Sequence, residues 1–217
     1  MSALLKIILI IATCFASTFL LVKFTGVLSI EQIENWLVQA KELSPIYVGT
    51  LVVLLLFADL FIAVPTLTIS ILSGYLLGYT YGSISALTGI VLSGVCGYSL
   101  SRYYGDTMLQ ILVKDEDKRN EAISIFNKHG VVMILLSRAM PILPEVSACL
   151  SGMTRLSFRK FLLAWLTNSI PYVLIASYAG SISSFDNPKP AIYAAMGISL
   201  SLWFAWFVYH QMQPKVH

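Results

Sequence analysis

Three ionisable side chains stand in apolar stretches of the chain, where charges are otherwise scarce. Asp59 follows the apolar run 51–58, while Arg138 and Glu145 lie between the apolar runs 131–136 and 146–150. A charge at the centre of a membrane helix costs about 2.5–3.5 kcal/mol on insertion scales, so such residues usually pair, meet water or bind a ligand. These three residues are therefore the candidates for substrate binding or proton coupling.

Arg138 is the candidate partner of an anionic group, because a guanidinium stays charged and binds phosphate oxygens in pairs. Asp59 and Glu145, partly removed from water, are candidates for proton exchange. The alternative is an internal ion pair between Asp59 and Arg138 that only locks two segments together. Such a pair leaves one of the three charges over, and an apolar contact would hold the segments with less desolvation. We therefore favour a polar cavity.

Asn168 and Pro171 are candidates for lining the same cavity, and a kink with a satisfied amide is the alternative for this pair. The histidines and the three cysteines have no metal-ligand or disulfide spacing. The chain also lacks a nucleotide-binding loop and a catalytic triad. We predict no metal, no cofactor and no enzyme activity.

The composition is that of an integral membrane protein. Of the 217 residues, 57% are hydrophobic and 12% are charged, whereas soluble domains carry about 25% charge. The net charge of +3 is small and spread along the chain, so nucleic acid is not an expected partner. Membrane lipids are the expected partners, together with protons if the carboxyls titrate, and homo-oligomerisation is left open.

We predict an all-α polytopic fold in three parts. Residues 1–44 form a first transmembrane helix and an amphipathic helix (29–43) that lies on the membrane surface, and residues 183–217 form a last transmembrane helix and a cytoplasmic tail. Residues 45–182 form the core. We divide this core into a hairpin (46–80), a span (82–102), a cytoplasmic loop (103–130), a second hairpin (131–154) and a second span (161–180).

The distribution of basic residues sets the expected topology. Lysine and arginine concentrate in 102–130 and 155–160, and such segments are cytoplasmic as a rule. Residues 131–154 must then leave the cytoplasm and return to it, which predicts a re-entrant hairpin. The same argument makes 46–80 a hairpin that enters from the outer face. The result is about four spans and two re-entrant hairpins in the cell (inner) membrane, with both termini cytoplasmic.

The two hairpins resemble each other in sequence. Asp59 stands six residues before Pro65, and Arg138 stands six before Pro144. The triplet Leu-Ser-Gly then follows at 72–74 and again at 150–152. The pattern predicts an inverted repeat, whose interface is where transporters of this kind bind substrate. The residues expected to shape the hairpins are Pro65, Gly74, Pro141, Pro144 and Gly152.

Two stretches carry a family resemblance. VPTLTISILSGYLLGYTYGSISALTGIVLSGVCGYSLSRYYG (64–105) has a proline, a glycine-rich span and a closing Arg-x-x-Gly, and LSRAMPILPEVSACLSGMTRLSFRKFLLAWLTNSIPYVLIASYAG (136–180) has an arginine-proline hairpin followed by a span. Together they resemble the VTT (SNARE-associated Golgi protein, DedA-like) family over about 45–182. The resemblance implies an inverted-repeat transporter linked to lipid scrambling or flipping, with Arg138 as the hairpin arginine and Asp59 as its acidic counterpart.

This sequence departs from the bacterial carrier-lipid branch of that family. That branch has a second arginine where Pro144 stands and a second acid near Thr66 or Leu67, and Glu145 is an addition here. The chain therefore looks nearer the Golgi-type branch. We predict a transporter that moves a phosphate-bearing lipid, a phospholipid or a polyprenyl-phosphate, between leaflets. The alternatives are a proton-coupled carrier of a small anion and a non-transporting membrane scaffold.

Overall fold

The computed structural model describes residues 3–25, 44–62, 64–139, 142–183 and 187–212. Over these ranges the chain is helical and has no strand, which confirms the predicted all-α class. The amphipathic helix expected at 29–43 lies outside the described residues, and so does Pro141. The elements are α1 (Ala3–Thr25), α3 (Pro45–Ala58), α4 (Thr66–Leu112), α5 (Glu116–Leu136), the 3₁₀ turn η1 (Ser137–Ala139), α6 (Leu143–Met153), α7 (Phe158–Ser181) and α8 (Lys189–Met212).

Helix α4 is broken into a short limb (66–77) and a long limb (79–112) at Gly78. Gly78 has φ 75° and ψ 172°, a backbone conformation that glycine adopts without steric penalty because it has no Cβ. The chain reverses there, so that Gly82 at the start of the long limb packs against Ser73 and Gly74 of the short limb. The break falls close to the predicted boundary between the first hairpin and its span.

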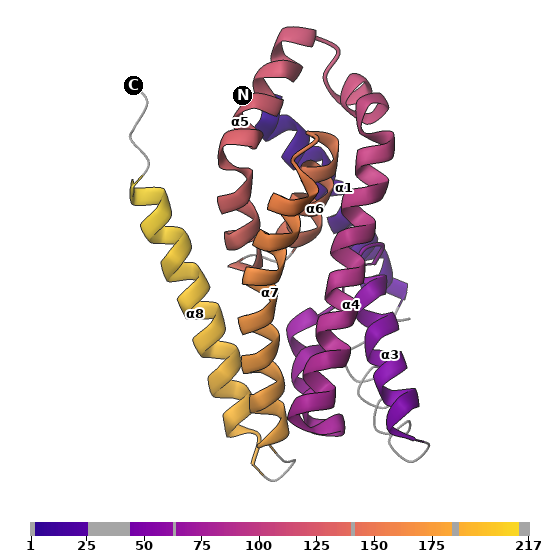
Figure 1. Cartoon of the computed structure of the whole chain (residues 1–217), viewed down its shortest axis with the longest axis vertical. Coiled ribbons are helices and arrows are strands. Elements are labelled where there is room, and N and C mark those ends of the chain that lie inside the picture. Colours follow the sequence, from indigo (N-terminus) through magenta and orange to yellow (C-terminus); the bar gives the residue numbers. More distant parts are fainter. Residues whose placement is uncertain (1–2, 26–43, 63, 140–141, 184–186, 213–217) are drawn as a thin grey trace.

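The long limb of α4 is the centre of the bundle, and α3, α6 and α7 pack against it (Figure 1). Helix α3 runs parallel to this limb, since Gly49 lies beside Ser85 and Leu60 lies beside Gly97. Helix α6 runs in the same direction on another side, where Gly152 meets Tyr98 and Arg102. The tips of both hairpins therefore point into the middle of the bundle from opposite ends.

The Leu-Ser-Gly glycines of the two hairpins occupy equivalent positions. A Cβ on Gly74 would overlap the backbone of Ser177 on α7, and a Cβ on Gly152 would overlap the backbone of Tyr98 on α4. Each glycine thus lies against the long helix that follows the other hairpin. Small residues permit this backbone contact, which drives helix association where lipid supplies no hydrophobic force. The repeated triplet therefore marks a repeated packing contact.

Helix α5 is longer than the sequence suggested. It starts at Glu116, capped by Asp115, whose side chain accepts a hydrogen bond from the Lys118 amide at 3.3 Å. Together with the long limb of α4, which continues to Leu112, it makes most of the expected loop 103–130 helical. Charge alone indicated a solvated segment, but a capped helix start is also a solvated and charged segment.

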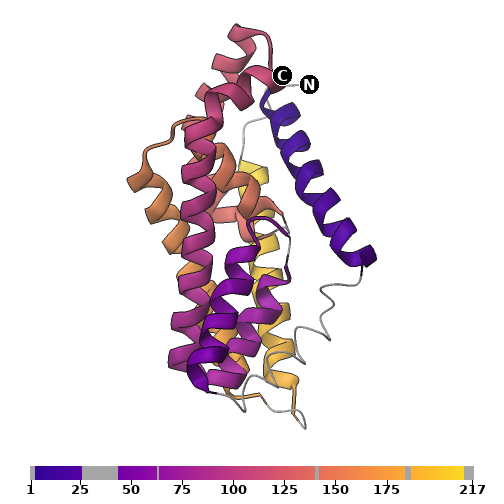
Figure 2. The same cartoon turned by 90° about the vertical axis from the view of Figure 1, so that its right-hand side faces the viewer.

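The outer helices complete the bundle. Helix α1 packs against α5 and α6, and α8 packs against α7 (Figure 2). The start of α1, the end of α8 and the α4–α5 connection all lie toward the same end of the molecule (Figure 1). Among the residues searched, two helices are long and apolar enough to cross a membrane, Thr66–Gly105 and Phe158–Ser181. The exact number of spans stays a prediction.

Candidate functional site

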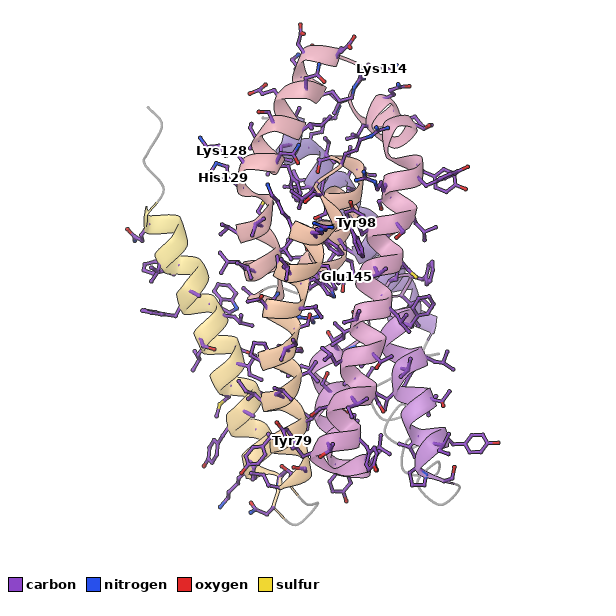
Figure 3. All side chains as sticks on the ribbon, viewed as in Figure 1. Tyr79, Tyr98, Lys114, Lys128, His129 and Glu145 are labelled. Carbon is purple, nitrogen blue, oxygen red and sulfur yellow. The ribbon has the colours of Figure 1, made fainter. Side chains whose placement is uncertain are left out.

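The two hairpin tips meet around a small cavity, here called the polar cavity. Its volume of about 10 Å³ is close to the minimum that holds one water molecule. Glu145 lies between α6 and the long limb of α4 at this level (Figure 3). The lining residues come from α3 and its tip (Leu56, Asp59, Leu60), α4 (Ile90, Ser93, Gly94), η1 (Arg138), α6 (Pro144, Glu145, Ala148) and α7 (Trp165).

Asp59 forms the tip of the first hairpin. It is the C-cap of α3, is only 7% exposed, and its Oδ1 accepts a hydrogen bond of 2.9 Å from the Val64 amide. This bond closes the turn that leads to Pro65, the N-cap of the short limb of α4. The carboxyl thus has a structural role in the turn.

Arg138 lies at the tip of the second hairpin, in the 3₁₀ turn η1 that directly follows α5. Its Nη2 donates to Ser169 Oγ at 3.2 Å, and its Cζ lies 4.6 Å from the centre of the Tyr172 ring and 5.7 Å from that of Trp165. Cation–π contacts of this kind strengthen where water is excluded. The Nε is buried without a hydrogen-bond partner. The guanidinium is therefore held in place by α7 and keeps unused donor capacity.

Glu145 occupies the first turn of α6, just after Pro144. It is 8% exposed, and its Oε2 is buried without a hydrogen-bond partner. A proline suits the start of a helix because its missing N–H has no intrahelical partner there. The N-cap residue of α6, Ile142, has φ 74°, which is strained for a β-branched residue. Backbone strain and a buried carboxylate oxygen without a partner thus coincide at this tip.

The three predicted residues share one cavity but form no ion pair. Within the described part of the chain, no carboxylate oxygen lies within 4.0 Å of the Arg138 guanidinium nitrogens. Two carboxyls and one guanidinium carry a charge of −1 if all are ionised and 0 if one proton is bound. Unpaired charges are costly at such burial. The arrangement can therefore take up a proton, or an anion when the carboxyls are neutral.

The other predicted residues have supporting positions. Asn168 donates from Nδ2 to the Ile134 carbonyl at 3.0 Å and to Ser137 Oγ at 3.4 Å, so its amide braces the end of α5 beside Arg138. Pro171 is exposed on α7. Neither residue lines the polar cavity. The satisfied amide of Asn168 fits the alternative weighed for this pair.

Three residues of α7 that contact Arg138 were not predicted: Trp165, Ser169 and Tyr172. With Asn168 they have the spacing i, i+3, i+4 and i+7, which places all four on one helix face. This stripe of polar and aromatic side chains along an apolar span can be found in the sequence, but only once Arg138 is known to need a partner on α7. Trp165 also donates from Nε1 to the Ile90 carbonyl at 3.2 Å, which ties α7 to the long limb of α4.

Apolar helices on the outside and converging ionisable groups within define the class of α-helical integral membrane protein. Residues 64–182 match the VTT domain, and the chain belongs to this VTT-domain (DedA) family. The chain is similar to an uncharacterized membrane protein of Synechocystis, 27% identical over 180 residues (71% of this chain and 78% of the relative). It is also similar to the uncharacterized protein YqeD of Bacillus subtilis, 28% identical over 152 residues (69% and 73%).

A third relative is an uncharacterized membrane protein of Buchnera aphidicola, 27% identical over 134 residues (56% of this chain and 52% of the relative). No solved structure matches the chain significantly. The predicted family is thus confirmed, and with it the membrane location, while the placement in a Golgi-type branch stays a prediction.

Proposed function

We propose that the protein moves a phosphate-bearing lipid between the two leaflets of the cell membrane through the space between its hairpin tips. The observation that carries the proposal is the state of Arg138. Its guanidinium is held by Ser169 and Tyr172, has a buried Nε without a partner, and is not neutralised by an ion pair. A fixed guanidinium with free donors is suited to bind a phosphate group.

The hairpins are re-entrant in this proposal and enter from opposite faces. Two observations support this arrangement. The hairpin tips point into the bundle from opposite ends, and basic residues concentrate toward one end of the molecule. Lys114 and Lys128 lie toward the end of the molecule that holds the start of α1 and the end of α8 (Figure 3). By the positive-inside rule this end is cytoplasmic, so both termini are cytoplasmic.

In this proposal Asp59 and Glu145 offset the charge of Arg138 between transport events. They take up a proton when the phosphate arrives and release it when the phosphate leaves. Because the polar cavity has room for about one water molecule, the conformation described here is closed. The hairpin tips must separate to admit a headgroup while the acyl chains stay in lipid. A phospholipid is the first candidate substrate, since Pro144 replaces the second arginine of the carrier-lipid branch, and a polyprenyl-phosphate is the second.

The test is leaflet exchange of a fluorescent phospholipid in liposomes that contain the purified full-length protein. Dithionite bleaches only the outer-leaflet label, so exchange appears as bleaching of the inner pool. We expect exchange with the wild type, loss with Arg138→Ala, and retention with Arg159→Ala, which removes an exposed arginine at the start of α7. Absence of exchange in the wild type contradicts the proposal, and exchange that survives Arg138→Ala contradicts the role of Arg138.

A proton-coupled carrier of a small anion is the second candidate, since the buried Arg138 Nε without a partner also suits a water-soluble anion. Flux of radiolabelled phosphate without lipid exchange would identify it.

The third candidate is a scaffold that needs Asp59 and Arg138 only as a pair. In that case the charge-swapped double variant Asp59→Arg/Arg138→Asp restores the cellular function that each single variant loses, whereas lipid transport predicts no rescue because Ser169 and Tyr172 hold a guanidinium at 138 only.

A further inference from the structure

A second cavity, here called the apolar cavity, lies on the other side of α6. Its volume is about 110 Å³, and it lies between α1, α5 and α6. An engineered apolar cavity of about 150 Å³ stays dry because of its lining and is large enough to bind benzene. The present cavity is somewhat smaller and accommodates a few methylene groups. Its lining residues are Ile8, Met133, Leu136, Leu143, Val146, Ser147 and Leu150.

The two cavities are separated by one short helix. On α6, Pro144, Glu145 and Ala148 line the polar cavity, whereas Leu143, Val146 and Leu150 line the apolar one. The same division occurs just before the turn, where Leu136 lines the apolar cavity and Arg138 the polar one. The tip of the second hairpin therefore presents a charged side and an apolar side within a few residues of each other.

We infer that the apolar cavity is a binding site for an acyl chain of the lipid whose phosphate engages Arg138. This inference rests on the proposed function and names the substrate as an amphiphile bound at both sides of α6. The polarity of the two sides matches the two parts of such a molecule, because a phosphate needs the guanidinium and a chain needs a dry, apolar site. An acyl chain in this cavity would also contact α1. This helix lies outside the VTT domain (64–182) and would thereby take part in substrate binding.

Helix α1 offers a variant that fills the apolar cavity without touching the polar one. Ile8 lines the cavity from α1, while its neighbour Leu9 points outward and is 47% exposed. Ile8→Trp should occupy the chain site, Ile8→Ala should enlarge it, and Leu9→Trp adds the same tryptophan on the outer face. Because α1 packs only at the edge of the bundle, these variants are expected to fold.

The experiment uses the full-length protein in phosphatidylglycerol liposomes with a phosphatidylglycerol that carries a photoreactive diazirine on one acyl chain. After illumination, adducts are mapped by mass spectrometry on peptides that cover 143–150 and, as a measure of general lipid contact, on the exposed face of α8 (200–207). We expect Ile8→Trp to lower labelling of 143–150 about tenfold, the change that follows when about two chain methylenes lose their burial. Labelling of α8 should not change, and Leu9→Trp and Ile8→Ala should label like the wild type or more.

Equal labelling of 143–150 in all four proteins overturns the inference. The labelling does not depend on transport, so the two proposals fail separately. Specific labelling without leaflet exchange keeps the acyl-chain site and contradicts lipid transport. Leaflet exchange with labelling of 143–150 that Ile8→Trp leaves unchanged keeps the proposed function and contradicts the acyl-chain site.

Discussion

At the scale of single residues, Arg138 and Asp59 differ in how they are held. Arg138 is positioned by side chains of α7, through Ser169 and the Tyr172 ring. Asp59 is positioned by its own backbone neighbourhood, through the Val64 amide. A guanidinium fixed by another helix responds to movement between helices, whereas the carboxyl moves with its own turn. Any movement of the first hairpin relative to α7 would therefore change the distance between the two groups.

The hydrogen bond of Asp59 leads to a prediction that separates shape from charge. Asp59→Asn keeps an acceptor oxygen for the Val64 amide, whereas Asp59→Ala leaves that buried donor without a partner. An unsatisfied buried donor costs about 1–3 kcal/mol, so the alanine variant should be less stable than the asparagine variant by about that amount. Unfolding of the purified variants in detergent micelles measures the difference. Equal stabilities would show that the bond contributes little.

Sequence patterns indicated the three ionisable residues of the polar cavity but not their contacts. Asp59, Arg138 and Glu145 are recognisable because charge in an apolar stretch is rare. The packing of the two hairpins and the span α7 determines the contacts of Arg138. It brings the guanidinium onto α7 and leaves it without an ion pair within 4.0 Å. Local residue spacing contains no such information. The stripe of Trp165, Ser169 and Tyr172 is visible in the sequence only once the partner arginine is known.

At the scale of helices, the repeated glycines determine how closely the hairpins approach the spans. Gly74→Ala and Gly152→Ala would each place a methyl group against backbone atoms of the facing helix, and backbone cannot move aside as a flexible side chain can. Overpacking typically costs about 1–3 kcal/mol, and we expect values in the upper part of that range for both variants.

The matched control is Gly197→Ala on α8, where an added Cβ meets no atom within 4 Å. Alanine favours a helix over glycine by up to about 1 kcal/mol, so this variant should be neutral or more stable. Thermal unfolding of the three variants in the same detergent makes the comparison. Similar losses at all three positions would mean that close approach is not what the Leu-Ser-Gly triplets provide.

The start of α5 should depend on pH through its N-cap. The Lys118 amide and then the Lys118 ammonium, 3.1 Å from Oδ2, lower the pKa of Asp115 below its usual value of 3.8. A lowered pKa in the folded state means that the cap stabilises fully above pH 3.8 and loses this effect as the pH falls through the folded-state pKa. Hydrogen-exchange protection of the first turn of α5 should therefore decline in this acidic range.

Asp115→Asn is the control for this effect, because asparagine caps a helix without titrating over this range. Its protection should be insensitive to pH across the same interval once intrinsic exchange rates are divided out. A parallel decline in both proteins would assign the loss to general acid unfolding and not to Asp115.

The secondary structure followed from the sequence more fully at some positions than at others. Prolines at 65 and 144 and the Leu-Ser-Gly triplets marked the hairpin limbs, because each sets a local backbone requirement. The extent of α4 to Leu112 and the start of α5 at Glu116 did not follow, since a charged helix and a charged loop look alike in composition. Gly78 was one of seven glycines between 74 and 105, and only its φ of 75° distinguishes it as the point of reversal.

At the scale of the whole molecule, both hairpin tips close on the polar cavity against the long limb of α4. Leu60 at the tip of the first hairpin and Ala148 on α6 of the second lie against the same position of that limb, Gly97. With room for about one water molecule, the polar cavity cannot hold a phosphate headgroup until the tips move apart. Any transport through it therefore requires relative movement of the two hairpins.

A cross-link between the tips tests this requirement directly. In a variant without Cys14, Cys96 and Cys149, cysteines at Leu60 and Ala148 can be joined by a short thiol reagent that contains a cleavable bond. Leaflet exchange should fall to the level of protein-free liposomes after cross-linking and return after cleavage, because the reagent changes the movement of the tips while Arg138 stays in place. Each single-cysteine variant, treated in the same way, controls for the bulk of the reagent. Undiminished exchange in the cross-linked protein would mean that lipid passes along another surface, and that the meeting of the two hairpins serves only to hold the bundle together.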